Sequence, residues 1–97
     1  MLFAIRFTDH PAAFTIRKQY LSPHLAWLAQ RRTRVKAAGS LRAKNSDQPV
    51  GALWIVEAEN EEDARAIFAD DPFWVHGLRA SVEILSWSLA FEEMLKD

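Results

Sequence analysis

The 97-residue sequence contains no cysteine and only three glycines, and its acidic and basic residues nearly cancel, which leaves a net charge of −1. Without cysteine the chain has no disulfide and no thiolate nucleophile, and its three scattered histidines lack the spacing of a zinc site. A nearly neutral chain also has no overall field that attracts nucleic acid or an anionic membrane. We therefore expect no metal site, no nucleic-acid partner and no membrane partner.

Long apolar runs are also missing, since none approaches the roughly 18 residues that suggest a membrane-spanning helix. The first apolar stretch contains Arg6 and has no basic segment before it, which favours a strand over a signal peptide. A composition of 49% hydrophobic and 26% charged residues is typical of a globular protein. We expect one domain over residues 1–97, located in the cytoplasm.

Hydrophobic periodicity predicts four strands and two helical regions. The expected strands are residues 2–8, 35–43, 51–58 and 79–88. The first helical region is expected as two pieces, 12–20 and 23–32, broken at Ser22-Pro23 because the residue before proline avoids the helical conformation. The second begins after an Asn60 cap and ends by Asp70. This β-α-β-β-α-β order predicts a ferredoxin-like α+β fold, with helices on one face of a four-stranded antiparallel sheet.

The other face of such a sheet has no helix to cover it. Either Trp54 and Val56 or Leu53 and Ile55 must point toward this open face, because side chains alternate along a strand. Four tryptophans in so short a chain add to the apolar surplus. We expect a homodimer formed through the open sheet face, with Trp54 and Trp87 as contributors.

Two residues are candidates for proton-transfer chemistry. His24 lies near the start of the second helical piece, where neighbouring charges can adjust an imidazole for work near neutral pH; it could equally be an ordinary helix histidine. Asp71 precedes Pro72, where a carboxylate either accepts from turn amides or holds an imidazole in one tautomer.

Weaker candidates lie in the loops and in a strand. Asp9 follows the first strand and could reach a cleft at the strand end or cap the next helix. Ser40 follows Gly39, whose missing side chain lets a ligand approach, but no GxSxG motif surrounds it. A basic run begins at Arg31, yet residues 50–57 lack the exposed aromatics of an RNA-recognition strand, so a solvated helix end is the interpretation.

Several short motifs, in their order and spacing, resemble the YciI-like (YCII-related domain) family over about residues 1–88. They are His24-Leu25-Ala26-Trp27-Leu28, Ala38-Gly39-Ser40-Leu41 and the acidic-start helix that closes on Asp70-Asp71-Pro72-Phe73. The resemblance implies a dimeric ferredoxin-like fold of the α/β-barrel type, a core at 1–88 and a C-terminal tail at 89–97. Many members carry Arg-Pro-Ala-His where this chain reads Leu-Ser-Pro-His, so it lacks that arginine.

The resemblance also implies a site in a cleft beside the sheet. Carried over by position, His24 and Asp71 are the catalytic pair, and Asp9, Ser40 and Phe73 are ligand-binding. Trp27 and Trp74, close to the pair in sequence, are expected to wall the cleft. The implied function is cofactor-independent acid/base chemistry of the isomerase, lyase or dehydrochlorinase kind on a small cyclic or aromatic substrate. The alternative is a non-catalytic small-molecule-binding or structural dimer module.

Overall fold

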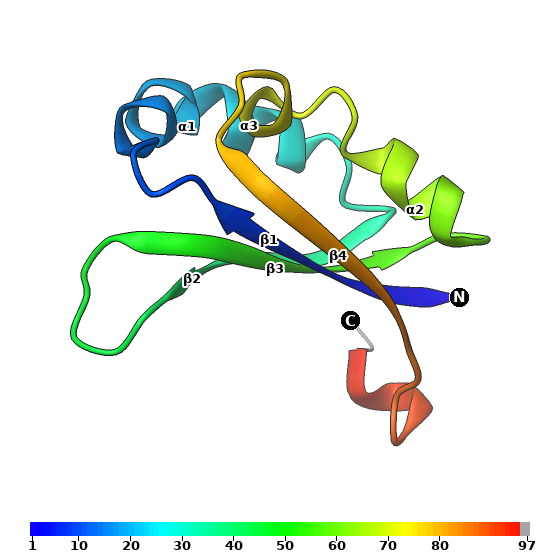
Figure 1. The fold of residues 1–97 in the computed structure, drawn as a ribbon. Coiled ribbons are helices and arrows are strands. Elements are labelled where there is room, and N and C mark those ends of the chain that lie inside the picture. Colours follow the sequence, from blue (N-terminus) through cyan, green and yellow to red (C-terminus); the bar gives the residue numbers. More distant parts are fainter. Residues whose placement is uncertain (96–97) are drawn as a thin grey trace.

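The computed structural model describes residues 1–95 of the chain. Its strands are β1 (Leu2–Asp9), β2 (Val35–Arg42), β3 (Pro49–Glu57) and β4 (Arg79–Trp87). Its helices are α1 (Phe14–Ala29), α2 (Glu61–Ile67), α3 (Pro72–Val75) and the 3-10 helix η1 (Glu92–Leu95). The strands form one antiparallel sheet in the order β2-β3-β1-β4, and α1, α2 and α3 all lie over one face of it (Figure 1). The predicted ferredoxin-like α+β fold is confirmed.

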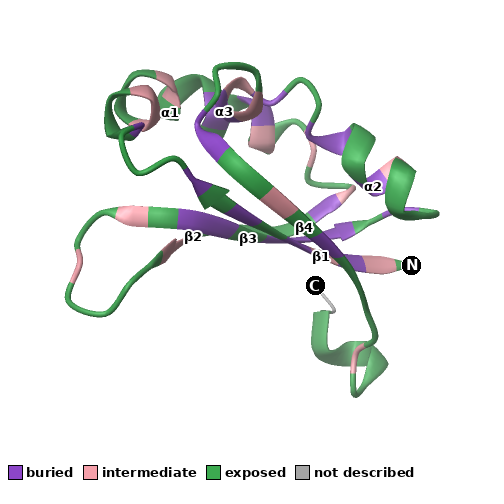
Figure 2. Ribbon diagram, viewed as in Figure 1, coloured by how far each residue is buried: buried purple, intermediate pink, exposed green. Residues whose placement is uncertain are grey.

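The hydrophobic core lies between the sheet and the helices. Residues Phe3, Ile5 and Phe7 alternate along β1 and are buried, and buried segments concentrate where the layers meet (Figure 2). Strand β3 places Trp54 opposite Ile5 and Val56 opposite Phe3, so these two side chains also point toward the helices. Of the two alternatives that the sequence leaves open, the second holds: Leu53 and Ile55 point toward the open face. The prediction that Trp54 contributes to a dimer interface is therefore wrong.

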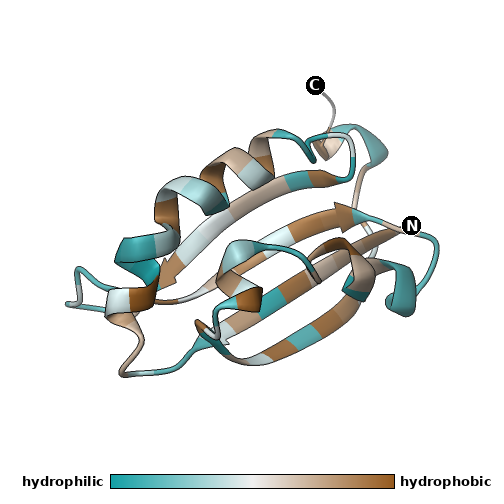
Figure 3. Ribbon diagram, turned by 90° about the horizontal axis from the view of Figure 1, so that it is seen from above, coloured by the Kyte–Doolittle hydropathy of each residue, from teal (hydrophilic) through white to brown (hydrophobic). Residues whose placement is uncertain are grey.

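The open face carries the alternate residues of each strand. Leu53 and Leu85 are 42% and 53% exposed there, and Trp87, which pairs with Leu2, is 39% exposed. Hydrophobic and hydrophilic residues follow one another along the strands in the view from the helix side (Figure 3). The tail after β4 turns to the open side of the sheet, where η1 lies (Figure 1). Part of the predicted tail, residues 96–97, lies outside the described residues.

Helix α1 runs without interruption through Pro23, so the predicted break at Ser22-Pro23 is wrong. An interior proline removes one backbone donor and costs a helix about 3 kcal/mol. Burial of His24 and Trp27, which follow Pro23 on the core side, offsets this cost because tertiary packing contributes most of a helix's stability. His24 therefore lies within a 16-residue helix rather than near a helix start.

The second helical region ends before Asp70 as predicted, and a further short helix that was not predicted follows it. Asn60 caps α2 as predicted, since its side chain accepts from the Asp63 N–H, and α2 ends at Ile67. The carboxylate of Asp63 accepts from the Glu59 N–H and is ion-paired with Arg34, and these contacts lower its pKa. A separate helix, α3, then begins after Asp71. Within residues 1–95, no helix has the length and apolar character to cross a membrane.

Gly51 on β3 gives the first testable prediction. A Cβ built there would lie 2.0 Å from the backbone carbonyl oxygen of Phe7, so Gly51→Ala must push β3 away from β1. We expect a loss of about 1–3 kcal/mol in the free energy of unfolding, measured by urea denaturation. Gly39→Ala is the matched control, because a Cβ at Gly39 meets nothing within 4 Å. Equal urea midpoints for the two variants would contradict the expectation.

Candidate functional site

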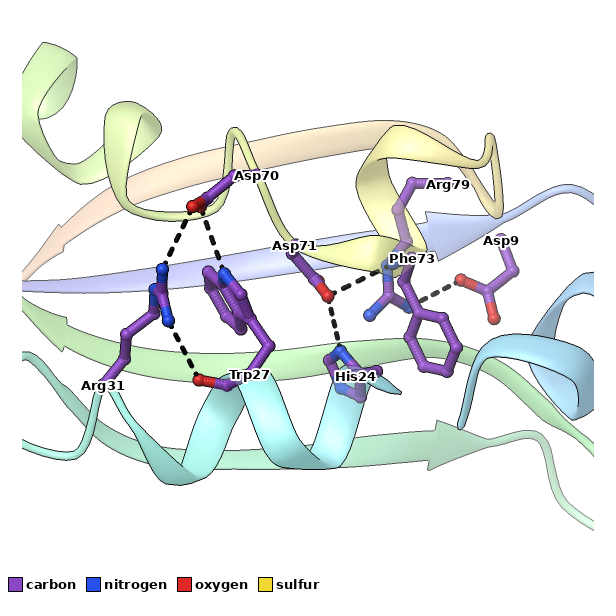
Figure 4. A network of polar contacts seen from close by, with 8 residues as sticks. All are labelled: Asp9, His24, Trp27, Arg31, Asp70, Asp71, Phe73 and Arg79. Atoms are coloured by element: carbon purple, nitrogen blue, oxygen red, sulfur yellow. Dashed lines mark hydrogen bonds and ion pairs between the residues drawn. The ribbon is translucent and has the colours of Figure 1, made fainter. Parts of the chain in front are cut away.

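His24 and Asp71 meet although they are 47 residues apart. The Nδ1 of His24, from α1, lies 2.7 Å from Oδ1 of Asp71, the N-cap residue of α3, and both side chains are buried (Figure 4). Since an ionised carboxylate only accepts hydrogen bonds, Nδ1 of His24 is the donor in this contact. The same Oδ1 accepts from the Phe73 N–H at 3.2 Å. Asp71 thus serves both as a turn cap and as the partner of the imidazole.

His24 lines a pocket of about 140 Å³ between α1 and the sheet. A cavity of about 150 Å³ accommodates benzene, so this volume suits one six-membered ring. Ser40 and Phe73 line the pocket, as expected from the resemblance, and Ser40 Oγ accepts from Arg42 at 2.8 Å. Trp54 also lines it. The expected walls, Trp27 and Trp74, do not, because both side chains pack elsewhere in the core.

Aromatic contacts fix the orientation of the His24 ring. The rings of His24 and Phe73 stack with centroids 4.0 Å apart and planes 16° apart, and the Trp54 ring centroid lies 6.1 Å away. Phe73 is itself fully buried in a small cluster with Ala13 and Leu78. The imidazole is therefore held between an aromatic neighbour and a carboxylate, and its Nε2 makes no hydrogen bond within residues 1–95.

Asp9 anchors two arginines. Its Oδ1 accepts from Arg79 at 2.8 Å and its Oδ2 from Arg17 at 2.6 Å, and all three side chains are largely buried. Arg17 and Arg79 line the pocket, whereas Asp9 does not and borders a different cavity. Figure 4 shows Asp9 beside the guanidinium of Arg79. Asp9 thus lies behind the arginines that face the pocket.

Arg79 is the most deeply buried cation of the site, with 1% of its side chain exposed. Burial lowers the pKa of Arg79, and the hydrogen bond to Asp9 opposes this shift. An arginine keeps its charge even so. The Nε of Arg79 and the Oδ2 of Asp71 are both buried without a hydrogen-bond partner within residues 1–95. Because buried polar groups are normally paired, these two atoms are exceptions, and both belong to residues in contact with side chains that line the pocket or themselves line it.

A second set of contacts holds the segment that carries Asp71. Asp70 accepts from Trp27 Nε1 at 3.1 Å and from Arg31 at 3.0 Å, and the Arg31 guanidinium lies 4.4 Å from the Trp27 ring centroid. His24 and Trp27 lie one turn apart on the same face of α1, and Arg31 follows in the turn after the helix ends at Ala29. Two consecutive aspartates thus contact the C-terminal part of α1 and the turn that follows it (Figure 4).

Sequence reasoning missed Arg17 and Arg79. The available signal was the alternation of β1: a period of two that buries Phe3, Ile5 and Phe7 also places Asp9 on the buried face. A buried carboxylate needs a cation, which predicts a nearby arginine or lysine without saying which one. These two arginines bring positive charge to the site from α1 and β4, although the arginine before His24 is missing. Within residues 1–95, no cluster of three or more His, Cys, Asp or Glu side chains could hold a metal.

The fold and the site together define a class: a small ferredoxin-like α+β domain with a buried histidine–carboxylate pair beside a pocket of ring size. The chain belongs to the YCII-related domain family, whose model matches residues 1–88. This confirms the family that the sequence motifs indicate. The comparison with curated proteins found no match.

Two solved structures illustrate the relationship. The chain is similar to TftG, the 5-chloro-2-hydroxyhydroquinone dehydrochlorinase of Burkholderia phenoliruptrix, in complex with 2,5-dihydroxybenzoquinone. That match has 26% sequence identity and a TM-score of 0.81, and it covers 91% of this chain and 94% of TftG. The chain is also similar to SnoaB, a cofactor-independent oxygenase from Streptomyces nogalater. This match has 19% identity and a TM-score of 0.54, and it covers 95% of this chain and 96% of SnoaB. The second likeness reflects the fold alone.

Proposed function

We propose that the chain is an enzyme that moves protons on a small hydroxylated aromatic substrate without a cofactor. The observation that carries this proposal is the 2.7 Å contact between Asp71 and His24, which lines a pocket of about 140 Å³. The likeness to TftG, at 26% identity over 91% of the chain, supports a substrate of the hydroxyhydroquinone kind.

His24 acts as the general acid and base. Its Nε2 takes a proton from a ring hydroxyl, and Asp71 stabilises the imidazolium that forms. Arg79 and Arg17 line the same pocket, where their charge favours the oxyanion that the substrate develops. Asp9 serves the reaction through these two arginines, which it holds in place.

On a chlorinated hydroquinone, these steps amount to loss of hydrogen chloride. The imidazolium returns its proton to the ring carbon that carries chlorine, which gives a ketone form of the ring. The C–Cl bond then breaks and chloride leaves with its electron pair. A second hydroxyl loses its proton to His24, and its O–H electron pair forms the new carbonyl bond. The ring is oxidised to a quinone while its C–Cl bond becomes C–H, so no external oxidant or reductant is needed.

A turnover assay tests the proposal. The protein is incubated with 5-chloro-2-hydroxyhydroquinone without added metal or cofactor, chloride is measured, and quinone formation is followed by absorbance. We expect chloride and quinone in equal amounts, at a rate proportional to protein concentration. Arg65→Gln, an exposed change on α2, is expected to match the wild type. Tight binding without chloride release would favour a binding module. The absence of both binding and turnover would overturn the proposal.

We propose also that two copies of the chain pair through the open sheet face. Leu53, Leu85 and Trp87 expose apolar surface there, interrupted by the Arg6–Glu83 ion pair of 2.7 Å. An apolar face of this kind is costly to leave in water and is typical of a protein interface.

Light scattering is the measurement that checks the pairing. At micromolar concentration, we expect the wild type to have the mass of a dimer and Leu85→Asn to have that of a monomer, because a polar group would enter an apolar interface. Val75→Asn is the matched control, since Val75 is 59% exposed on α3 on the helix side. A monomeric wild type, or equal effects of the two variants, would argue against this interface.

A further inference from the structure

A second cavity of about 370 Å³ adjoins the pocket of His24 and shares Arg17, Leu21 and Ser40 with it. We call this cavity the vestibule. Its remaining border includes Phe14 and Lys18 from α1 and Arg42 from the end of β2. The two cavities are therefore neighbours, and Arg17, Leu21 and Ser40 lie where a substituent on a ring in the pocket would enter the vestibule.

The vestibule is rich in positive charge. Lys18 and Arg42 form no ion pair within residues 1–95, and Arg17 shares the single carboxylate of Asp9 with Arg79. Among the described residues, no carboxylate borders the vestibule. Cations gathered in a concave site without matching acids favour a bound anion.

Arg42 is exposed, but two hydrogen bonds orient its guanidinium. Its Nη1 donates to Ser40 Oγ at 2.8 Å, and its Nε donates to the backbone carbonyl of Asp47 at 3.0 Å. This arrangement fixes the guanidinium beside Ser40, which borders both cavities. A guanidinium oriented in this way matches the two oxygens of a carboxylate better than a freely moving lysine does.

Apolar surface accompanies the cations. Phe14 and Leu21 border the vestibule and are 48% and 43% exposed. Apolar groups on one side and fixed cations on the other suit an acid group attached to a carbon skeleton, rather than a free inorganic ion.

We propose that the vestibule binds a carboxylate substituent of the substrate, so that the preferred substrates are hydroxylated aromatic acids. This inference rests on the proposed function only for the placement of the ring beside His24. Lys18 and Arg42 are its specificity-determining residues, and neither contacts the reacting atoms.

Equilibrium binding of a matched ligand pair tests the proposal. The probes are 2,5-dihydroxybenzoate and 2,5-dihydroxybenzamide, which share a ring and a shape and differ in charge. We expect the wild type to bind the acid about tenfold more tightly than the amide at low salt, because charged hydrogen bonds exceed neutral ones. Added salt should reduce the difference. Arg42→Gln and Lys18→Gln should each weaken binding of the acid several-fold and leave the amide unchanged.

The control separates a local effect from one of net charge. Arg65→Gln removes one positive charge on α2 and should change neither affinity. Equal binding of acid and amide by the wild type, or an effect of Arg65→Gln equal to that of Arg42→Gln, would overturn the proposal. If chloride release fails while the acid is still preferred, the reaction proposal alone falls. If turnover occurs without preference for the acid, the vestibule proposal alone falls.

Discussion

Replacing His24 with asparagine is expected to lower kcat for chloride release by about 10²–10⁴-fold, the usual contribution of a general acid–base residue. The carboxamide of asparagine can still donate to Asp71, in place of Nδ1, but it has no counterpart of Nε2 that can take a proton. Binding of 2,5-dihydroxybenzamide should change little, because the pocket walls remain. The measurements are steady-state kinetics and the dissociation constant of that ligand.

Asp71→Asn separates the roles within the pair. Its amide keeps an oxygen that accepts from the Phe73 N–H, so α3 retains its cap. It removes the negative charge that stabilises the imidazolium, and turnover should fall while the fold persists. Thermal unfolding and circular dichroism verify that both variants are folded. A His24→Asn protein that retains turnover within fivefold of the wild type would exclude His24 as the acid–base group.

The second large effect is expected in stability. Asp9→Asn should lower the free energy of unfolding by about 3–5 kcal/mol, the cost of removing one partner from a buried ion pair. Arg79 would then keep a buried charge with 1% of its side chain exposed and no acid beside its Nη1. Arg17 would lose the same partner. Urea denaturation at neutral pH measures the change.

Glu83→Gln is the matched control for Asp9→Asn. It also removes one carboxylate from an arginine pair, but Arg6 and Glu83 are 62% and 48% exposed. Exposed pairs contribute about 0–1 kcal/mol, so this variant should unfold close to the wild type. An equal loss in the free energy of unfolding for both variants would mean that burial does not determine how much the Asp9 ion pairs contribute to stability.

The sequence predicts the sheet well because local chemistry determines it. Phe3, Ile5 and Phe7 alternate with period two, and the Asn60 cap precedes acids that suit the first turn of a helix. These signals act between neighbouring residues, so they are readable without the fold.

Failures of prediction arise where distant contacts outweigh local preference. Pro23 predicts a helix break, yet burial of His24 and Trp27 keeps α1 continuous. Helix α3 has four residues, too few for any periodic pattern to indicate it. Alternation alone could not say which face of β3 the helices cover, since both of its faces are apolar.

The candidate site depends even more on distant contacts. His24 and Asp71 are 47 residues apart and Asp9 and Arg79 are 70 apart, so no local pattern brings either pair together. The pair was identified from the family resemblance, and the arginines were missed. Only the fold places α1, α3 and the start of β4 around one pocket.

Different elements supply the proposed catalytic pair and the small residues of the pocket lining, which has a consequence for divergence within the family. The proposed proton-transfer pair comes from α1 and the N-cap of α3, whereas β2, an edge strand, contributes Ala38, Gly39 and Ser40 to the pocket lining. All three are small and exposed, so larger side chains there would shorten or reshape the space without disturbing His24 or its partner. Substrate size can therefore evolve on one strand while the chemistry stays unchanged on two helices.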